Sequence, residues 1–153
     1  MKTKIKFFLH KDHFLSTSTT RFKHYNSTNM SHETLQVIVV EGRNLKDKDT
    51  FGQNDAYIEL YLDKNYKQRT STIKDTNSPV WNETFNFNLL KGQDHLHIQV
   101  YDEDVVGKDS IGAAKISLKK IQQAGGKLDE WIKLPAHLGL GSNGEIHLIL
   151  RLS

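Results

Sequence analysis

Residues 95–112 read HLHIQVYDEDVVGKDSIG, and the alternation at the start of this stretch decides the fold class. Leu96, Ile98 and Val100 are apolar and the positions between them are polar, so apolar side chains return at every second residue. A period of two places these side chains on one face of a β-strand, whereas an amphipathic helix repeats near 3.6 residues. The sequence therefore predicts a strand over 95–101 that leads into an acidic connection.

The same short period recurs from Leu35 to the end of the chain, in segments separated by Gly, Asn, Asp and Pro. It predicts eight strands, over residues 35–40, 56–62, 67–73, 83–89, 95–101, 111–117, 130–134 and 145–152. One helical turn is predicted over 118–124. Short strands at fairly regular spacing are typical of an antiparallel sandwich, so the fold class we expect is an all-β, eight-stranded antiparallel β-sandwich.

The bulk composition indicates one globular domain. A chain of 153 residues has room for one domain and little else. No apolar run approaches the roughly 18 residues that a membrane-spanning helix needs. The sequence has no cysteine, which excludes disulfides and thiolate metal sites and fits a reducing compartment.

The positive net charge of the chain arises in its first 29 residues. These contain five lysines, Arg21 and a single acid, Asp12, which gives +5; since the whole chain carries +3, the remainder carries −2. Because the predicted sandwich is slightly acidic, nucleic acid is not an expected partner.

Residues 1–32 lack the strand period and are predicted to be a disordered basic tail, followed by one domain over 33–153. Two other interpretations stay open. The segment is basic, rich in hydroxyl side chains and poor in acids, as organelle transit peptides are, although it has only one arginine. The third interpretation is that translation begins at Met30.

Five aspartates fall in two connections that an antiparallel sandwich can bring to the same end. Asp49 and Asp55 lie between the first and second predicted strands, and Asp102, Asp104 and Asp109 lie between the fifth and sixth. Like charges about 4 Å apart repel by roughly 4 kcal/mol per pair at an effective dielectric near 20, so such a cluster requires a cation or solvent screening. Calcium suits this cluster, because it prefers oxygen ligands and accepts about 6–8 of them in irregular geometry.

Four segments of the chain together resemble the C2 domain family of calcium-dependent lipid-binding sandwiches. The segments are VVEGRNL (39–45), DTFGQNDAY (49–57), NSPVWNETF (77–85), and VYDED (100–104) with DSIG (109–112). Each segment alone is a weak signal, but their combination and order are specific. The chain departs from the family pattern at Ala56, where proline is usual, and at Ser78, where asparagine is usual; its third loop is one residue shorter than in many members.

The resemblance implies a C2-type sandwich of the permuted topology, since the chain ends in an additional strand over 145–152. The calcium ligands that it implies are Asp49, Asp55, Asp102, Asp104 and Asp109. It also implies calcium-dependent binding to anionic phospholipid membranes, as in small C2 proteins of plants and fungi. We therefore expect a monomer that is cytoplasmic and peripheral to membranes.

Two groups of residues are predicted to contact lipid. The apolar residues at the loop tips, Phe51, Val105 and Val106, gain nothing from exposure to water, and we predict that they insert into a bilayer interface. The alternative is that they pack against each other. A basic face around the third strand is predicted to attract anionic lipid and comprises Lys64, Lys67, Arg69 and Lys74. An ordinary solvated strand face is the alternative there.

Other functions have weaker support in the sequence. His95 and His97 share one face of their strand, but no third zinc ligand is evident, so a solvent-facing pair is predicted. No nucleophile, base and orienting group can be assigned together, so the chain is not predicted to be an enzyme. The alternative function is a calcium-independent adaptor that docks a protein partner through the third-strand face, and a metal-dependent phosphodiesterase is a distant third.

Overall fold

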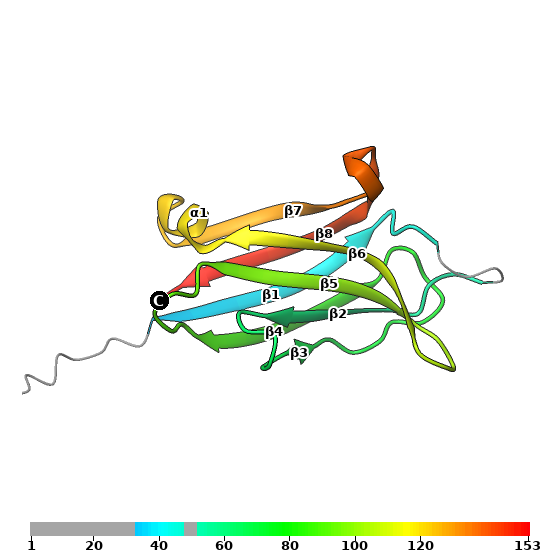
Figure 1. Ribbon diagram of the computed structural model, residues 1–153, viewed down its shortest axis with the longest axis horizontal. Coiled ribbons are helices and arrows are strands. Elements are labelled where there is room, and N and C mark those ends of the chain that lie inside the picture. The colour runs from blue at the N-terminus through cyan, green and yellow to red at the C-terminus, as the bar shows by residue number, and fades with distance from the viewer. Residues whose placement is uncertain (1–32, 48–51) are drawn as a thin grey trace, which may run out of the picture. The chain divides into compact units, whose positions relative to one another are not determined.

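The computed structural model describes residues 33–47 and 52–153, whose strands form two antiparallel sheets packed face to face (Figure 1). Sheet A contains, in spatial order, β4 (Val80–Asn88), β1 (Thr34–Arg43), β8 (Ser142–Leu152) and β7 (Lys127–Pro135). Sheet B contains β3 (Gln68–Arg69), β2 (Ala56–Tyr61), β5 (His95–Glu103) and β6 (Lys108–Ser117). The helix α1 (Leu118–Gln123) follows β6, and the short 3-10 turn η1 (His137–Gly139) lies between β7 and β8. The predicted all-β sandwich is confirmed.

The core lies between the two sheets because the strands bury alternate side chains. On β5, Leu96, Ile98 and Val100 are fully buried, as the alternation predicts. Leu35 and Val37 on β1 are buried in the same way from the opposite sheet. Burial of each such side chain stabilises the fold by about 1.5–3 kcal/mol, so this layer holds the two sheets together.

The last strand closes sheet A beside the first. β8 lies between β1 and β7, with Arg43 aligned to Glu145 at one end and Leu35 aligned to Leu152 at the other. This is the order that the permuted topology requires, in which the additional C-terminal strand pairs with the first strand of the domain.

The strand predicted over 67–73 is much shorter in the structure, where β3 has two residues. Thr70 is the cause: its side-chain Oγ1 accepts a hydrogen bond from the backbone N–H of Ile58 at 3.0 Å. A hydroxyl thus occupies the place of a backbone carbonyl in the ladder, and such local bonds compete with strand pairing. Beyond β3 the backbone N–H of Thr70 still donates to the carbonyl of Ile58 at 3.0 Å, and the next paired residues are Ala56 and Ile73, in an isolated bridge.

Four connections, β1–β2, β3–β4, β5–β6 and β7–β8, lie at one end of the sandwich, which we call the loop end; it is on the right in Figure 1. Backbone bonds join them, from Leu45 N to Asn77 O at 3.0 Å and from Lys46 N to Asn143 O at 3.0 Å. At the opposite end, the far end, the backbone N–H groups and carbonyls of residues 34 and 153 exchange two hydrogen bonds of 2.8 and 3.1 Å.

Candidate functional site

Four of the five predicted calcium ligands lie at the loop end. Asp102, near the end of β5, is aligned with Asp109 on β6 and, on its other side, with the residue that follows Asp55. Cα atoms of directly opposed residues in antiparallel strands are about 4.5–5.5 Å apart. Asp104 follows β5 directly, at the start of the hairpin turn. The fifth predicted ligand, Asp49, lies outside the described residues.

Backbone hydrogen bonds fix two of these carboxylates. Asp102 is only 1% exposed, and its Oδ1 accepts a hydrogen bond from the backbone N–H of Asp55 at 2.7 Å. The backbone N–H of Glu103 donates to the carbonyl of Asp55 at 2.9 Å, so the loop and the strand end are joined in both directions. Oδ1 of Asp55 accepts a hydrogen bond from the backbone N–H of Asp75 at 2.8 Å. Carboxylates held in this way are positioned before any ligand arrives.

A buried asparagine, which the sequence analysis did not single out, braces the loops that carry the acids. The side chain of Asn54 donates to the carbonyl of Lys46 at 3.1 Å and to Oδ1 of Asn77 at 2.5 Å. Asn54 is fully buried, and a buried amide is stable only when it is hydrogen-bonded. Asn54 directly precedes Asp55 in the sequence, but only the fold shows that its side chain contacts Lys46 and Asn77.

The donor chemistry of this end fits calcium. Among residues 33–47 and 52–153, no three His, Cys, Asp or Glu side chains are arranged as a metal-binding group. The candidate side chains are all carboxylates, which are hard oxygen ligands of the kind that calcium prefers. Asp75, which the sequence analysis missed, adds a further carboxylate beside Asp55; its Oδ1 accepts a hydrogen bond from the backbone N–H of Gln53 at 3.0 Å.

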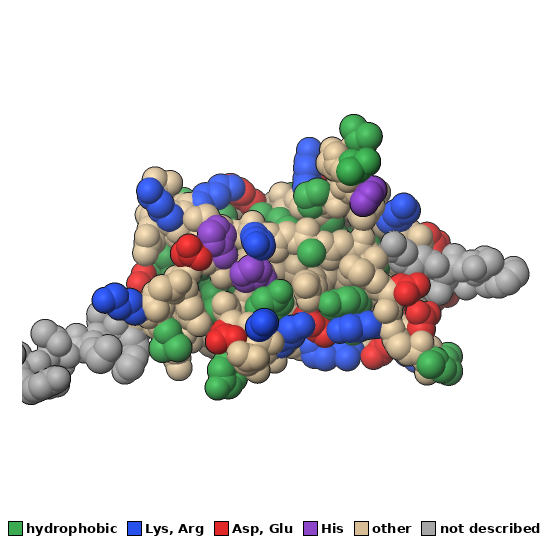
Figure 2. Space-filling view, viewed as in Figure 1, with side chains coloured by type: hydrophobic (Ala, Val, Ile, Leu, Met, Phe, Trp, Pro, Cys, Tyr) green, Lys and Arg blue, Asp and Glu red, His purple; other side chains and the backbone are tan. Residues whose placement is uncertain are grey.

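The turn between β5 and β6 projects two apolar side chains into solvent. Val105 is fully exposed and Val106 is 92% exposed. Such exposure does not fit the alternative that Val105 and Val106 pack against each other. Figure 2 shows hydrophobic side chains at this tip, next to the acidic side chains of the loop end. The third predicted tip residue, Phe51, lies outside the described residues.

The predicted basic residues spread along the side of sheet B and are not gathered in one cluster. Lys64 lies in the β2–β3 connection at the far end, and Lys74 lies in the β3–β4 connection at the loop end. Between them, Lys67 and Arg69 lie over aromatic rings: the Lys67 Nζ is 5.1 Å from the ring centroid of Tyr61. Figure 2 shows a band of basic side chains along this side of the molecule.

A single carboxylate holds two lysines on this face. Glu59 on β2 accepts hydrogen bonds from Lys67 at 2.8 Å and from Lys108 at 2.6 Å. Burial of Glu59 raises its pKa, but the hydrogen bonds from Lys108 and Lys67 outweigh this effect and leave the pKa below its usual value. The same contacts raise the pKa of both lysines. Glu59 is therefore ionised at neutral pH and offsets part of the positive charge of the face.

Lys108 belongs to the basic face although it was not predicted there. Its Nζ lies 3.8 Å from the ring centroid of Tyr101, and the guanidinium of Arg69 lies 3.7 Å from the ring centroid of Tyr57. The two rings stack with centroids 5.5 Å apart. Tyr57 and Tyr101 are directly opposed on neighbouring strands, so this arrangement depends on the strand register, which the local spacing of residues does not reveal.

The predicted histidine pair is partly packed against the sheet. His97 stacks on Tyr61 with ring centroids 4.8 Å apart, and the Nδ1 of His95 lies 2.7 Å from the Asp94 carboxylate. Burial, followed by the nearby charges of Lys115 and His95, lowers the pKa of His97. Within the described ranges these histidines belong to no metal-binding group.

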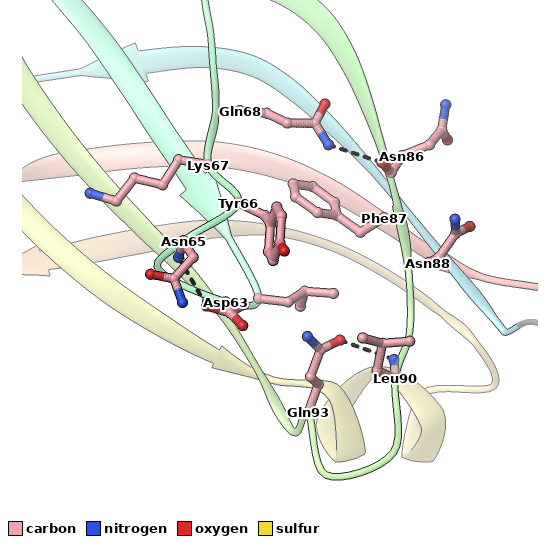
Figure 3. A pocket seen from close by; sticks show the side chains of 11 residues that line it. Asp63, Asn65, Tyr66, Lys67, Gln68, Asn86, Phe87, Asn88, Leu90 and Gln93 are labelled. Atoms are coloured by element: carbon pink, nitrogen blue, oxygen red, sulfur yellow. Dashed lines mark hydrogen bonds between the residues drawn. The ribbon is translucent and has the colours of Figure 1, made fainter.

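A groove of about 580 Å3 lies at the far end, between the β2–β3 and β4–β5 connections (Figure 3). Tyr66 and Leu90 flank it and are largely exposed, while Phe87 forms part of its floor. Gln68 bridges the two sheets at this groove, donating to the carbonyl of Asn86 at 3.0 Å. The groove is remote from the acidic residues of the loop end.

Similar proteins carry this domain as a small part of much longer chains. The chain is 33% identical over 112 residues to arrestin domain-containing protein B of Dictyostelium discoideum, covering 69% of this chain and 18% of that protein. It is 41% identical over 102 residues to the mouse RasGAP-activating-like protein 1, covering 65% and 13%. It is 33% identical over 89 residues to a calcium-dependent lipid-binding protein of Arabidopsis thaliana, covering 58% and 18%.

Solved structures agree with the fold. The calcium-bound pair of C2 domains of extended synaptotagmin 2 matches with a TM-score of 0.69 and 28% identity, over 79% of this chain and 45% of that chain. A human cytosolic phospholipase A2 of group IVD matches with a TM-score of 0.67 and 27% identity, over 78% of this chain and 16% of that chain. The family model for the C2 domain matches residues 33–134. With this match and the two-sheet fold, the chain belongs to the C2 domain family.

Proposed function

We propose that the domain binds anionic phospholipid membranes when calcium is present. The observation that carries this proposal is the buried, backbone-held Asp102 at the centre of the acidic loop end, beside Asp55 and Asp109. Relatives whose names state calcium or lipid binding support it. The residues that would hold calcium are Asp49, Asp55, Asp102, Asp104 and Asp109.

The charge of the loop end provides the switch. Without a cation, its carboxylates repel the anionic surface of a bilayer, which carries a potential of about −30 mV. When bound, calcium offsets this charge and offers coordination positions to lipid oxygens. The side chains of Asp55 and Asp102 are already fixed by backbone hydrogen bonds, so little ordering is required of them.

Apolar and basic side chains would add to the attraction. Val105 and Val106 are the most exposed of the large apolar side chains described, and each would contribute about 1–3 kcal/mol on full insertion. Phe51 is proposed to insert with them. The basic residues Lys64, Lys67, Arg69 and Lys74 are proposed to add electrostatic attraction to the anionic leaflet from the side of the domain, with Lys108 as an additional member.

Vesicle co-sedimentation tests the proposal directly. We expect the full chain to sediment with vesicles that contain phosphatidylserine when calcium is present. It should stay in the supernatant with chelator, and with vesicles of phosphatidylcholine alone. Equal sedimentation in calcium and in chelator would contradict the calcium switch.

Replacing Glu59 with glutamine should strengthen binding to anionic vesicles by roughly fivefold. The substitution removes the charge that offsets Lys67 and Lys108, and one basic residue near an anionic surface contributes about 1 kcal/mol. The matched control is Glu130→Gln, which makes the same change of net charge on β7, where Glu130 pairs with Lys120. A similar gain in both variants would attribute the effect to net charge alone.

The proposed membrane binding also implies where the protein acts and what class of protein it is. We propose a peripheral membrane protein of the cytoplasm that acts as a binding module and not as an enzyme. Of the helices in the described part of the chain, none has the length and apolar character needed to cross a membrane.

Docking of a protein partner is the second candidate function. The far-end groove favours it, because Tyr66 and Leu90 expose large apolar surface beside β3. Binding of such a partner should survive chelator and the absence of lipid, and should weaken when Tyr66 is replaced by serine. Loss of the partner on chelation would favour the membrane role alone.

A further inference from the structure

The β7–β8 connection exposes two leucines at the loop end that no role described so far explains. Leu138 is 81% exposed and Leu140 is 79% exposed. The turn that carries them is fixed, since the backbone N–H of Gly139 donates to the carbonyl of Ala136 at 3.0 Å. Just beyond it, the side chain of Asn143 donates to the carbonyl of Ile111 at 2.8 Å and ties the base of the turn to sheet B. These leucines are therefore presented outward by an ordered turn.

Leucine suits this turn poorly on two separate grounds. Leu138 has φ = 58° and ψ = 16°, in the left-handed region where a side chain with a Cβ is strained and where glycine or asparagine is preferred. Its exposed side chain also gains nothing from the core. Neither folding nor solvation accounts for two outward leucines here, so an apolar environment outside the domain is the remaining source of stabilisation.

We propose that the β7–β8 turn is a second membrane-inserting element, with Leu138 and Leu140 as its anchoring side chains. The proposal rests on the proposed membrane function. The turn lies at the same end as Val105 and Val106, and Figure 2 shows basic side chains beside it. Lys46, exposed at the base of the turn, is joined to it through the Asn143 carbonyl, and a cationic border favours an anionic bilayer.

Contact at both tips fixes how the domain meets the bilayer. The β7–β8 turn extends from sheet A and the β5–β6 hairpin extends from sheet B (Figure 1). A molecule lying on the outer face of sheet B would hold the β7–β8 turn away from the lipid. Insertion of both tips therefore requires an end-on approach, in which the basic face stands beside the bilayer and does not lie flat on it.

Fluorescent labelling tests this arrangement, because the chain has no cysteine of its own and each introduced cysteine is a unique site. An environment-sensitive dye would be attached to the full chain at Leu140→Cys, at Val106→Cys and, on α1 at the far end, at Gln122→Cys. With phosphatidylserine vesicles and calcium, we expect a blue shift at Leu140 and Val106 and none at Gln122. A shift at Val106 without one at Leu140 would overturn the inference and leave the proposed function standing. No shift at any site, with no co-sedimentation, would reject both.

A binding measurement with a matched control supplies a second readout. The double variant Leu138→Asn, Leu140→Ser should bind the same vesicles about tenfold more weakly, since two half-inserted leucines account for roughly that factor. Asparagine tolerates the backbone at position 138, so the melting temperature should not fall. The control Leu90→Ser removes a leucine that is 65% exposed at the far end and should leave vesicle binding unchanged. Equal losses in both variants, or none in the double variant, would overturn the inference.

Discussion

Replacing Asp102 and Asp104 together with asparagine should abolish calcium-dependent vesicle binding while the fold persists. A carboxylate about 4 Å from a cationic charge contributes on the order of 4 kcal/mol at an effective dielectric near 20, and even a third of that from two residues weakens calcium binding about 100-fold. The asparagine oxygen at position 102 can still accept the hydrogen bond from the Asp55 amide, so the β5 end should keep its position. Co-sedimentation over a calcium titration measures the loss.

Two controls separate this effect from general charge and from stability. The pair Asp63→Asn, Asp94→Asn makes the same change of net charge at the far end and should bind vesicles as the unchanged chain does. Calcium should raise the melting temperature of the unchanged chain by mass action, and this rise should vanish in the Asp102, Asp104 variant. Sedimentation of the double variant at the original calcium concentration would refute the assignment of these two ligands.

Replacing Gly144 with alanine should destabilise the domain by about 3 kcal/mol or more and lower its melting temperature by roughly 10 °C. Gly144 has φ = 113°, and a Cβ there would lie 2.7 Å from the carbonyl oxygen of Asn44 and 2.8 Å from the Cα of Leu45. Both are backbone atoms, which cannot rotate away. The collision occurs where β1 leaves for the acidic loop, so any vesicle binding by the variant should be lost at a correspondingly lower temperature. Thermal unfolding followed by circular dichroism measures the shift.

Gly92→Ala isolates the part of this effect that comes from the backbone angle alone. Gly92 also has a positive φ, of 93°, but nothing lies within 4 Å of its Cβ position. Its substitution should cost about 1–2 kcal/mol. If the two alanine variants unfolded at the same temperature, the close approach of β8 to the exit of β1 would not matter for stability.

The sequence predicted strands correctly where the period of buried side chains determines them. It predicted a strand of the wrong length where a side chain takes the place of a backbone group in the hydrogen-bond ladder. The alternation of Leu96, Ile98 and Val100 was sufficient for β5, because burial on one face dictates a period of two. The segment 67–73 has only one apolar residue, Ile73, and so no comparable alternation; in the structure the hydroxyl of Thr70 takes the bond from the Ile58 amide and the regular ladder ends at Arg69. Nothing in the spacing of residues distinguishes a threonine that bonds in this way from one that does not.

The acidic residues of the candidate site could be predicted from the sequence, but the residues that surround and position them could not. Loop position was enough to place Asp55, Asp102, Asp104 and Asp109 at one end, because antiparallel strands return their connections there. Pairings across strands need the register, which the sequence does not give. Only the structure therefore shows that Glu59 accepts hydrogen bonds from two lysines and that Asn54 bonds to residues of neighbouring loops.

Thr34 and Ser153 lie side by side, which makes this domain suitable for insertion into other proteins. Their side-chain hydroxyls lie 2.6 Å apart, so both boundaries of the sandwich leave from one point. A host protein could receive residues 34–153 within a surface loop without separating the loop's own ends, as domain insertion requires. That point is opposite the acidic connections, so a reporter fused there would not obstruct them. The domain can thus be inserted into or removed from a host chain as one unit.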